Sequence, residues 1–187
     1  TGRALDANSD GLANLALAVE LLHTFTLIHD DIMDNDDTRH GQPAIHFKWD
    51  DSTAILAGDG INAIAQILLS GLPYRSNAIC RSFNQATLEV CEGQAYDKEF
   101  ENDLSITENQ YLEMIEKKTG SLLGASANLP AILIGADPEV ISYFDQFGRA
   151  LGNGFQIHDD LLEIYGNVDD MGKSLGSDIA EGKQTMM

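Results

Sequence analysis

Cysteine is nearly absent from this chain of 187 residues, and long uninterrupted apolar runs are missing as well. The two cysteines are Cys80 and Cys91. Two cysteines cannot form the disulfide framework of a small secreted protein, so a reducing compartment is expected, and the predicted location is the cytoplasm. The sequence has neither a recognisable signal peptide nor an apolar run of transmembrane length. We therefore predict no integral membrane segment.

Basic residues are also scarce. The 11 lysines and arginines are outnumbered by 30 aspartates and glutamates, which gives a formal net charge of -19. Binding of nucleic acid through its phosphate backbone needs a basic patch, and a membrane-surface helix needs a basic face. Neither kind of partner is expected. With 43% hydrophobic residues the chain can form a sizeable core, and we predict one domain over residues 1–187 that is incomplete at both ends.

Strand-like alternation is rare, and the chain reads as nearly all helix. Apolar residues recur at helical spacing from Leu12 to Phe25, which predicts one long helix there. Thr107 and Gln110 have the spacing of a capping box at a helix start. Asp137-Pro138 fits an N-cap followed by proline in the first turn. The helix that follows is predicted to stop near Gly166, with a kink at residues 152–154.

Two short acidic segments each end an apolar helical pattern. The first acidic box, residues 28–34, reads I-H-D-D-I-M-D, and the second, residues 157–163, reads I-H-D-D-L-L-E. On a helix, Asp30 and Asp34 are i,i+4 neighbours, and Asp160 and Glu163 are i,i+3 neighbours, so each box gathers carboxylates on one face. Repelling carboxylates at the end of an apolar segment are costly unless a cation lies between them.

The chemistry of the boxes favours a hard divalent cation. Mg²⁺ takes one or two carboxylates and completes its shell with water and substrate phosphate. A single acidic box is more often a solvated face, but two boxes in the same context would form a cage for a diphosphate. A calcium loop from Asp34 is excluded, because Arg39 and Ile45 replace its glycine and final glutamate. The candidate metal ligands are Asp30, Asp31, Asp34, Asp159, Asp160 and Glu163.

Further motifs occur in a fixed order around the boxes. They are D-D-T-R-H-G-Q-P at residues 36–43, I-L-A-G-D at 55–59, G-Q-A-Y-D at 93–97, K-T-G-S-L at 118–122 and G-S-D-I-A-E-G-K-Q-T at 176–185. Together with the boxes, these segments resemble the trans-isoprenyl diphosphate synthases (polyprenyl synthetases), such as farnesyl and geranylgeranyl diphosphate synthase. The resemblance extends along the whole chain.

The resemblance implies a fold and a reaction. The fold is an all-α isoprenoid synthase helical bundle with a central active-site cavity, normally assembled as a homodimer. The reaction is a Mg²⁺-dependent, head-to-tail condensation of isopentenyl diphosphate with an allylic diphosphate, with three Mg²⁺ ions when substrate is bound. An allylic cation forms when the carbon–oxygen bond ionises, and the double bond of isopentenyl diphosphate attacks it.

The resemblance also assigns roles to single residues. Lys118, Thr119 and Gln156 are the implied catalytic set, and Thr119 and Gln156 present oxygen dipoles near the developing cation. Asp97 and Asp178 are implied to orient metal-bound water or lysine. His29 and His158 are expected to pack beside the ligands, because Mg²⁺ prefers oxygen. The implied substrate-binding set is Arg39, His40, Lys118, Thr119, Gln156, Lys173 and Lys183.

Phe25 is the candidate determinant of product length. It lies five residues before Asp30, where the family uses a bulky side chain to stop the growing tail. Its neighbours Thr24 and Thr26 add no second ring, so a C15–C20 product is expected, with C20 favoured. The alternative is an ordinary core phenylalanine.

Two other functions stay open at this point. In the resemblance, His40 stands where the family has an arginine that grips isopentenyl diphosphate, and imidazole cannot make that bidentate contact. Glu163 replaces the last aspartate of the second box. A non-catalytic regulatory subunit of a heteromeric prenyl synthase would tolerate both changes. A class I terpene cyclase would use the same ionisation without isopentenyl diphosphate, although the second box and Lys118-Thr119 follow the chain-elongation pattern.

Overall fold

The computed structural model describes residues 1–7 and 11–165, the last three of them by their backbone alone. Within these residues the only β-structure is the short antiparallel pairing of β1 (Thr38–Arg39) with β2 (Gln42–Pro43). The predicted all-α fold is confirmed. The helices are α1 (Gly11–Asp34), α2 (Ile45–Lys48), α3 (Asp51–Ser70), α4 (Ser76–Phe100), α5 (Glu108–Ile115), α6 (Ser121–Ile134) and α7 (Pro138–Tyr165), with one π-helical turn, η1 (Glu116–Gly120), between α5 and α6.

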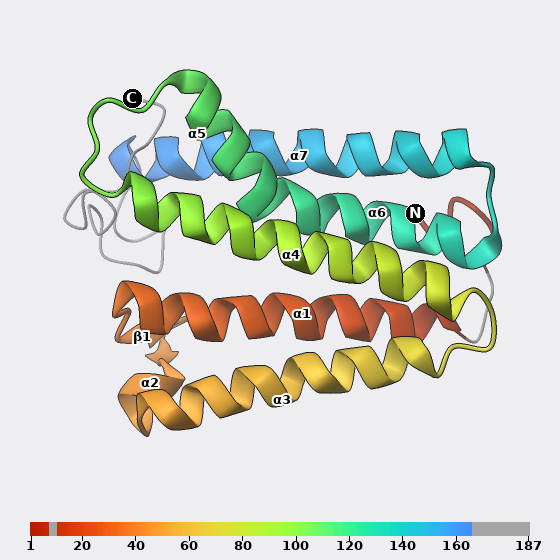
Figure 1. Ribbon diagram of the computed structural model, residues 1–187, viewed down its shortest axis with the longest axis horizontal. Coiled ribbons are helices and arrows are strands. Elements are labelled where there is room, and N and C mark those ends of the chain that lie inside the picture. Colours follow the sequence, from red (N-terminus) through yellow and green to blue (C-terminus); the bar gives the residue numbers. More distant parts are fainter. Residues whose placement is uncertain (8–10, 166–187) are drawn as a thin grey trace.

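The long helices lie side by side along one axis of the molecule (Figure 1). α1 packs against α3 and α6, while α4 and α7 both pack against α6 and η1. α1, α4 and α7 all finish at the same end of the bundle (left in Figure 1). The two acidic boxes are therefore carried to one end of the molecule by helices that are distant in sequence.

Two apolar clusters hold this arrangement. The larger joins four helices through fully buried side chains, which include Leu15, Leu22, Leu69, Ile79, Phe83 and Leu129. The smaller lies beside the acidic end and consists of Phe100, Tyr111, Met114 and Ile115. Burial of each such side chain stabilises the fold by roughly 1.5–3 kcal/mol. α4 contributes to both clusters and so connects the core with the acidic end.

The helix boundaries follow local chemistry. Asp50 caps α3 by accepting a hydrogen bond from the Thr53 backbone N–H at 2.8 Å. The predicted capping box of Thr107 and Gln110 is confirmed at the start of α5. α6 ends at Gly135, whose φ of +73° favours glycine. α7 begins at Pro138 as predicted, and it continues without a break through residues 152–154 to Tyr165.

Two helices do not agree with the prediction that the chain has no apolar segment of transmembrane length. α1 and α3 are each long and apolar enough, by length and composition, to cross a membrane. The core helix of a bundle has the same length and composition, and α1 packs against both α3 and α6.

Candidate active site

A cavity of about 760 Å³ opens between α1, α4, α5, η1, α6 and α7. Its inner wall is apolar and includes Val19, Phe25, Val90, Leu122 and Leu123. We use "mouth" for the other end, where α1, α4 and α7 finish (Figure 1). Among the described residues that line the cavity are two lysines, Lys98 and Lys118, and six aspartates: Asp30, Asp34, Asp36, Asp97, Asp159 and Asp160.

The first acidic box divides between two environments. Asp30 and Asp34 line the cavity, as their i,i+4 spacing predicts. Asp31 is buried at the hairpin instead, where it accepts a hydrogen bond from Arg39 Nε at 2.7 Å. Burial raises the pKa of Asp31, although Arg39 opposes this effect. Arg39 also donates to Asp36 at 3.2 Å, so its guanidinium is held at the edge of the mouth by two carboxylates.

Lys118 joins two carboxylates from different helices. Its Nζ lies 2.5 Å from Oδ2 of Asp97 on α4 and 3.6 Å from Oδ1 of Asp30 on α1. The buried Oδ1 of Asp30 accepts no hydrogen bond from the part of the chain that the structure describes. Nearby, buried Gln94 has an amide nitrogen that likewise lacks an acceptor among those residues. Among the described residues, Asp30 Oδ1 thus has an ion pair with Lys118 but no hydrogen bond, and it borders the same cavity as the Gln94 amide nitrogen.

Lys98 serves Asp34 in the same way. Its Nζ lies 3.4 Å from Oδ1 of Asp34 and 2.5 Å from Oε1 of Glu101. Burial lowers the pKa of Lys98, but these two carboxylates outweigh that effect and leave the pKa raised. Lys98 therefore stays charged beside the first acidic box.

The second acidic box lies opposite, on α7. Asp159 and Asp160 both line the cavity. Asp160 accepts hydrogen bonds from the Tyr111 hydroxyl at 2.6 Å and from Gln156 Nε2 at 3.0 Å. Gln156 in turn accepts from Thr119 Oγ1 at 2.8 Å. The structure thus brings Thr119 and Gln156 together, as the resemblance implies.

Burial and the Asp160 carboxylate raise the pKa of Tyr111 well above its usual range. Its hydroxyl is therefore a permanent hydrogen-bond donor. The side chain of Glu163 and all of Lys173, Asp178 and Lys183 lie outside the described residues.

The π-helical turn η1 presents Lys118 and Thr119 to the cavity. Such turns are rare and are frequently found at functional sites. A Cβ on Gly93 of α4 would come within 2.2 Å of the Lys118 backbone nitrogen, and one on Gly152 of α7 within 2.7 Å of Gly120 Cα. The turn is therefore gripped by backbone on both sides. The small size of Gly152 therefore permits the close approach of η1 to α7.

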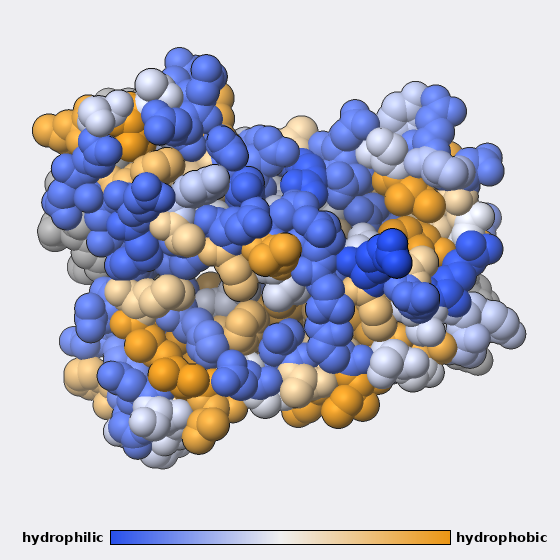
Figure 2. All heavy atoms as spheres, viewed as in Figure 1, coloured by the Kyte–Doolittle hydropathy of each residue, from blue (hydrophilic) through white to orange (hydrophobic). Residues whose placement is uncertain are grey.

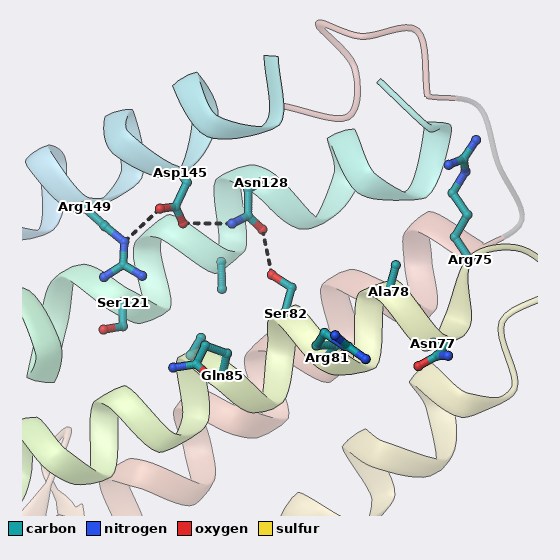
Figure 3. Close-up of a pocket in the computed structure, with 12 residues that line it drawn as sticks. Arg75, Asn77, Ala78, Arg81, Ser82, Gln85, Ser121, Asn128, Asp145 and Arg149 are labelled. Carbon is teal, nitrogen blue, oxygen red and sulfur yellow. Dashed lines mark hydrogen bonds and ion pairs between the residues drawn. The ribbon is translucent and has the colours of Figure 1, made fainter. Parts of the chain in front are cut away.

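A polar network supports the turn from behind. Arg149 on α7 donates to Asp145 at 2.9 Å and to Glu89 on α4 at 2.7 Å. Asp145 accepts from Asn128 at 2.8 Å, and Asn128 accepts from Ser82 at 3.4 Å (Figure 3). Burial raises the pKa of Glu89, but the bonds from Arg149 and Gln85 outweigh it and lower the pKa. Glu89 is therefore ionised, and the network ties α4, α6 and α7 together.

Arg149 also reaches η1 itself. Its Nη1 lies 3.8 Å from Oε1 of Glu116. Ser121 adds a bond from Oγ to the Lys117 carbonyl at 2.8 Å, which satisfies a carbonyl of the wide turn. The groove bordered by Arg149 and Asp145 shares no lining residue with the active-site cavity among the described residues. The network therefore supports η1 from the side away from the cavity.

Phe25 lies on the cavity wall, braced by a neighbouring ring. Its ring meets that of His29 edge-on, with centroids 4.6 Å apart. His29 Nε2 lies 3.3 Å from the Ile55 carbonyl, and Gly58 leaves space for the imidazole, because a Cβ there would come within 2.4 Å of it. His29 thus packs between α1 and α3, in agreement with its expected role.

His40 does not line the cavity. It is exposed in the β1–β2 turn with a φ of +52°. His158 is exposed on α7. Sequence reasoning missed Tyr111, Gln94 and Lys98 as parts of the site. The available signals were that Gln94 lies in the motif at residues 93–97 and that Tyr111 directly follows Gln110 of the predicted capping box.

Within the described residues, no three His, Cys, Asp or Glu side chains gather closely enough to hold a metal ion on their own. The donors that do line the mouth are carboxylate oxygens from α1, α4 and α7.

An all-α bundle whose two acidic boxes face one apolar cavity defines the class of isoprenoid synthases. The polyprenyl synthetase family model matches residues 1–187. The chain belongs to the polyprenyl synthetase family.

Named relatives agree with this assignment. The chain is 44% identical to a geranylgeranyl diphosphate synthase of Methanosarcina mazei, over 98% of this chain and 58% of that protein. It is 43% identical to a geranylfarnesyl diphosphate synthase of Natronomonas pharaonis, over 98% of this chain and 55% of that protein. A polyprenyl synthase from Caulobacter crescentus CB15, solved with calcium and isoprenyl diphosphate, superposes with a TM-score of 0.93 at 32% identity, over 99% of this chain and 56% of that one. The chain thus spans 55–58% of the length of these relatives.

The close packing of α4 against η1 leads to a prediction for Gly93. In Gly93→Ala the new Cβ meets Lys118 backbone at 2.2 and 2.6 Å, which cannot rotate away. α4 and η1 must separate, so the free energy of unfolding should fall by about 1–3 kcal/mol. Prenyl transfer should fall as well, because Lys118 moves away from Asp97. Urea denaturation followed by circular dichroism and a prenyl-transfer assay measure the two effects.

Gly154→Ala is the matched control. Gly154 is exposed on α7, and a Cβ there meets nothing within 4 Å among the described residues. This change should raise the free energy of unfolding by roughly 0.5–1 kcal/mol and leave activity unchanged. If Gly93→Ala unfolds at the same urea concentration as the wild type, the account of η1 is wrong.

Proposed function

We propose that this protein is a Mg²⁺-dependent prenyltransferase that condenses isopentenyl diphosphate with an allylic diphosphate, head to tail. The observation that carries the proposal is the charge imbalance at the mouth of an apolar cavity. Six aspartates and two lysines line that cavity within the described residues. The imbalance suits a cation with a diphosphate, and the apolar wall suits a prenyl chain.

The donor set fits Mg²⁺. Asp30 and Asp34 on one side and Asp159 on the other are the carboxylates that would hold it, with Asp30 supplying an oxygen that accepts no hydrogen bond from the described residues. A small number of carboxylates is what Mg²⁺ takes from proteins, since water and phosphate complete its shell. When bound, Mg²⁺ supplies charge that stabilises the departing diphosphate. We propose that three ions are present with substrate.

Lys118 and Arg39 would hold the allylic diphosphate. Lys118 is placed between Asp30 and Asp97, so it stays near the site where the phosphate oxygens arrive. Arg39 is oriented by Asp31 at the edge of the mouth. Lys173 and Lys183 are proposed to assist. His40 is proposed to contact isopentenyl diphosphate in place of the family's arginine.

Thr119 and Gln156 would stabilise the allylic cation after the carbon–oxygen bond ionises. Thr119 donates its proton to Gln156, so its oxygen lone pairs remain available to the cavity that it lines. Preorganised dipoles of this kind lower the barrier where charge develops. The double bond of isopentenyl diphosphate then attacks the cation, and the proton lost goes to the released diphosphate.

The product is proposed to be C15–C20, with C20 favoured. Phe25 stands on the wall that a growing tail would follow, and its contact with His29 fixes it there. The relatives named for geranylgeranyl and geranylfarnesyl products support a length near C20.

A cytoplasmic homodimer is the proposed assembly. Ile55, Leu56, Ile64 and Ile67 of α3 are 45–71% exposed. Figure 2 shows apolar surface along the edge where α3 lies in Figure 1. A second copy of the chain that packed against this face would bury those side chains. Cys80 and Cys91 are free thiols, which suits a reducing compartment.

An elongation assay tests the proposed function. The protein at its natural length is incubated with Mg²⁺, labelled isopentenyl diphosphate and, separately, dimethylallyl, geranyl or farnesyl diphosphate, and the extracted prenyl alcohols are sized. The expected product is C20, with none formed in excess EDTA. Asp30→Asn should lower kcat/KM on the order of 100-fold.

Glu99→Gln is the control, because it removes one charge from an exposed position of α4. It should leave kcat/KM within about twofold of the wild type. A cyclic hydrocarbon in place of a ladder would make the protein a cyclase. Diphosphate binding without any turnover would make it a regulatory subunit.

Phe25→Ala should lengthen the product beyond C20. Removal of the ring opens the wall more than one helical turn before Asp30, so the tail can extend further before it is stopped. Phe47→Ala is the matched control, since Phe47 is 60% exposed on α2 and lies outside the cavity lining. Chromatography of the alcohols compares the three proteins. An unchanged product from Phe25→Ala would remove Phe25 as the determinant of length.

A further inference from the structure

Tyr111 makes a buried contact that neither the sequence motifs nor the proposed mechanism uses. Its side chain is 2% exposed, and its hydroxyl donates to Oδ2 of Asp160 at 2.6 Å. Asp160 is itself 8% exposed. A hydrogen bond between a hydroxyl and a carboxylate is short and strong when both groups are withdrawn from water.

This contact begins a chain of hydrogen bonds that ends in the cavity. Oδ1 of Asp160 accepts from Gln156 Nε2 at 3.0 Å, and Gln156 Oε1 accepts from Thr119 Oγ1 at 2.8 Å. Each bond fixes the direction of the next. The carboxylate can only accept, so it takes the amide nitrogen of Gln156, which turns the amide oxygen toward Thr119. The Thr119 proton is then committed to Gln156.

This series of hydrogen bonds also connects two helical segments at two points. Tyr111 and Thr119 belong to the continuous segment formed by α5 and η1, while Gln156 and Asp160 are i,i+4 neighbours on α7. The contacts Tyr111–Asp160 and Thr119–Gln156 therefore set how α5–η1 lies along α7. Loss of the first contact loosens the second without changing any residue that touches substrate.

We propose that Tyr111 is a positioning residue for prenyl transfer, which acts through Asp160 and Gln156 to fix the direction of the Thr119 hydroxyl oxygen toward the allylic carbon. The inference rests on the proposed function. Asp160 then serves as the anchor of this chain, in addition to any part it has in holding Mg²⁺. Tyr111 itself contacts neither diphosphate nor the reacting carbons.

Tyr111→Phe tests the inference because it removes one oxygen and keeps the ring. It should lower kcat about tenfold, the effect typical of a lost supporting hydrogen bond. The KM for each diphosphate and the Mg²⁺ concentration for half-activation should stay within about twofold of the wild type. Tyr96→Phe is the matched control, since the Tyr96 ring stacks on Phe100 through its face and should keep full activity without the hydroxyl.

A double-mutant cycle separates positioning from a purely structural role. Thr119→Val removes the end of the chain, and Thr119→Ser keeps the hydroxyl. If Tyr111 acts through Thr119, Tyr111→Phe combined with Thr119→Val has the same kcat as Thr119→Val alone. Tyr111→Phe should still slow the Thr119→Ser enzyme about tenfold.

A wild-type kcat for Tyr111→Phe or multiplicative losses in the cycle would overturn the inference. A loss of fold in Tyr111→Phe would also overturn it, because the residue would then be structural. A shift in the Mg²⁺ requirement would place the effect at the metal and likewise contradict it. An inactive wild-type protein would refute the proposed function first, and that outcome is distinct because it precedes every comparison with a variant.

Discussion

The structure depends on carboxylates from three helices that face one cavity mouth in a chain of net charge -19. Such groups repel one another, and burial makes the repulsion costlier. In the described part of the chain, only a few cationic side chains offset this repulsion. Lys118 bridges Asp30 and Asp97, Lys98 lies on Asp34, and Arg39 neutralises Asp31. The remaining deficit suits a divalent cation and a diphosphate that arrive together. The proposed binding of Mg²⁺ and diphosphate therefore follows from the excess of negative charge at the mouth of the cavity.

The packing around η1 determines the position of the Lys118 ammonium group. Gly93 lets α4 touch the backbone at Lys118, and Gly152 lets α7 touch it at Gly120. α4 therefore both contacts the Lys118 backbone and carries Asp97, which pairs with the Lys118 side chain. A small change in the spacing between α4 and η1 would move Lys118 Nζ away from both Asp30 and Asp97. The bonds of Tyr111 and Thr119 to α7 act on the same turn from its other side. A rare helical turn is stable here because contacts on every side determine its position.

Much of this could be predicted from the sequence, and the failures have definite causes. The i,i+4 spacing of Asp30 and Asp34, the capping box at Thr107 and the start of α7 at Pro138 are local properties, and each is confirmed. The role of Gly152 in the contact with η1 was not predicted, because spacing along one helix does not reveal a contact between helices. The pairing of Asp31 with Arg39 needs the β1–β2 hairpin. Tyr111 and Asp160 lie 49 residues apart, so only the tertiary fold brings them together.

The central claim is that the carboxylates at the mouth require a cation and a diphosphate together. The direct measurement is thermal denaturation with Mg²⁺ alone, with an unreactive allylic thiolodiphosphate alone, and with both. The account predicts a rise in Tm with both ligands that clearly exceeds the sum of the separate rises, because each ligand neutralises charge that opposes the other. Equal stabilisation by the thiolodiphosphate in Mg²⁺ and in EDTA would contradict the account.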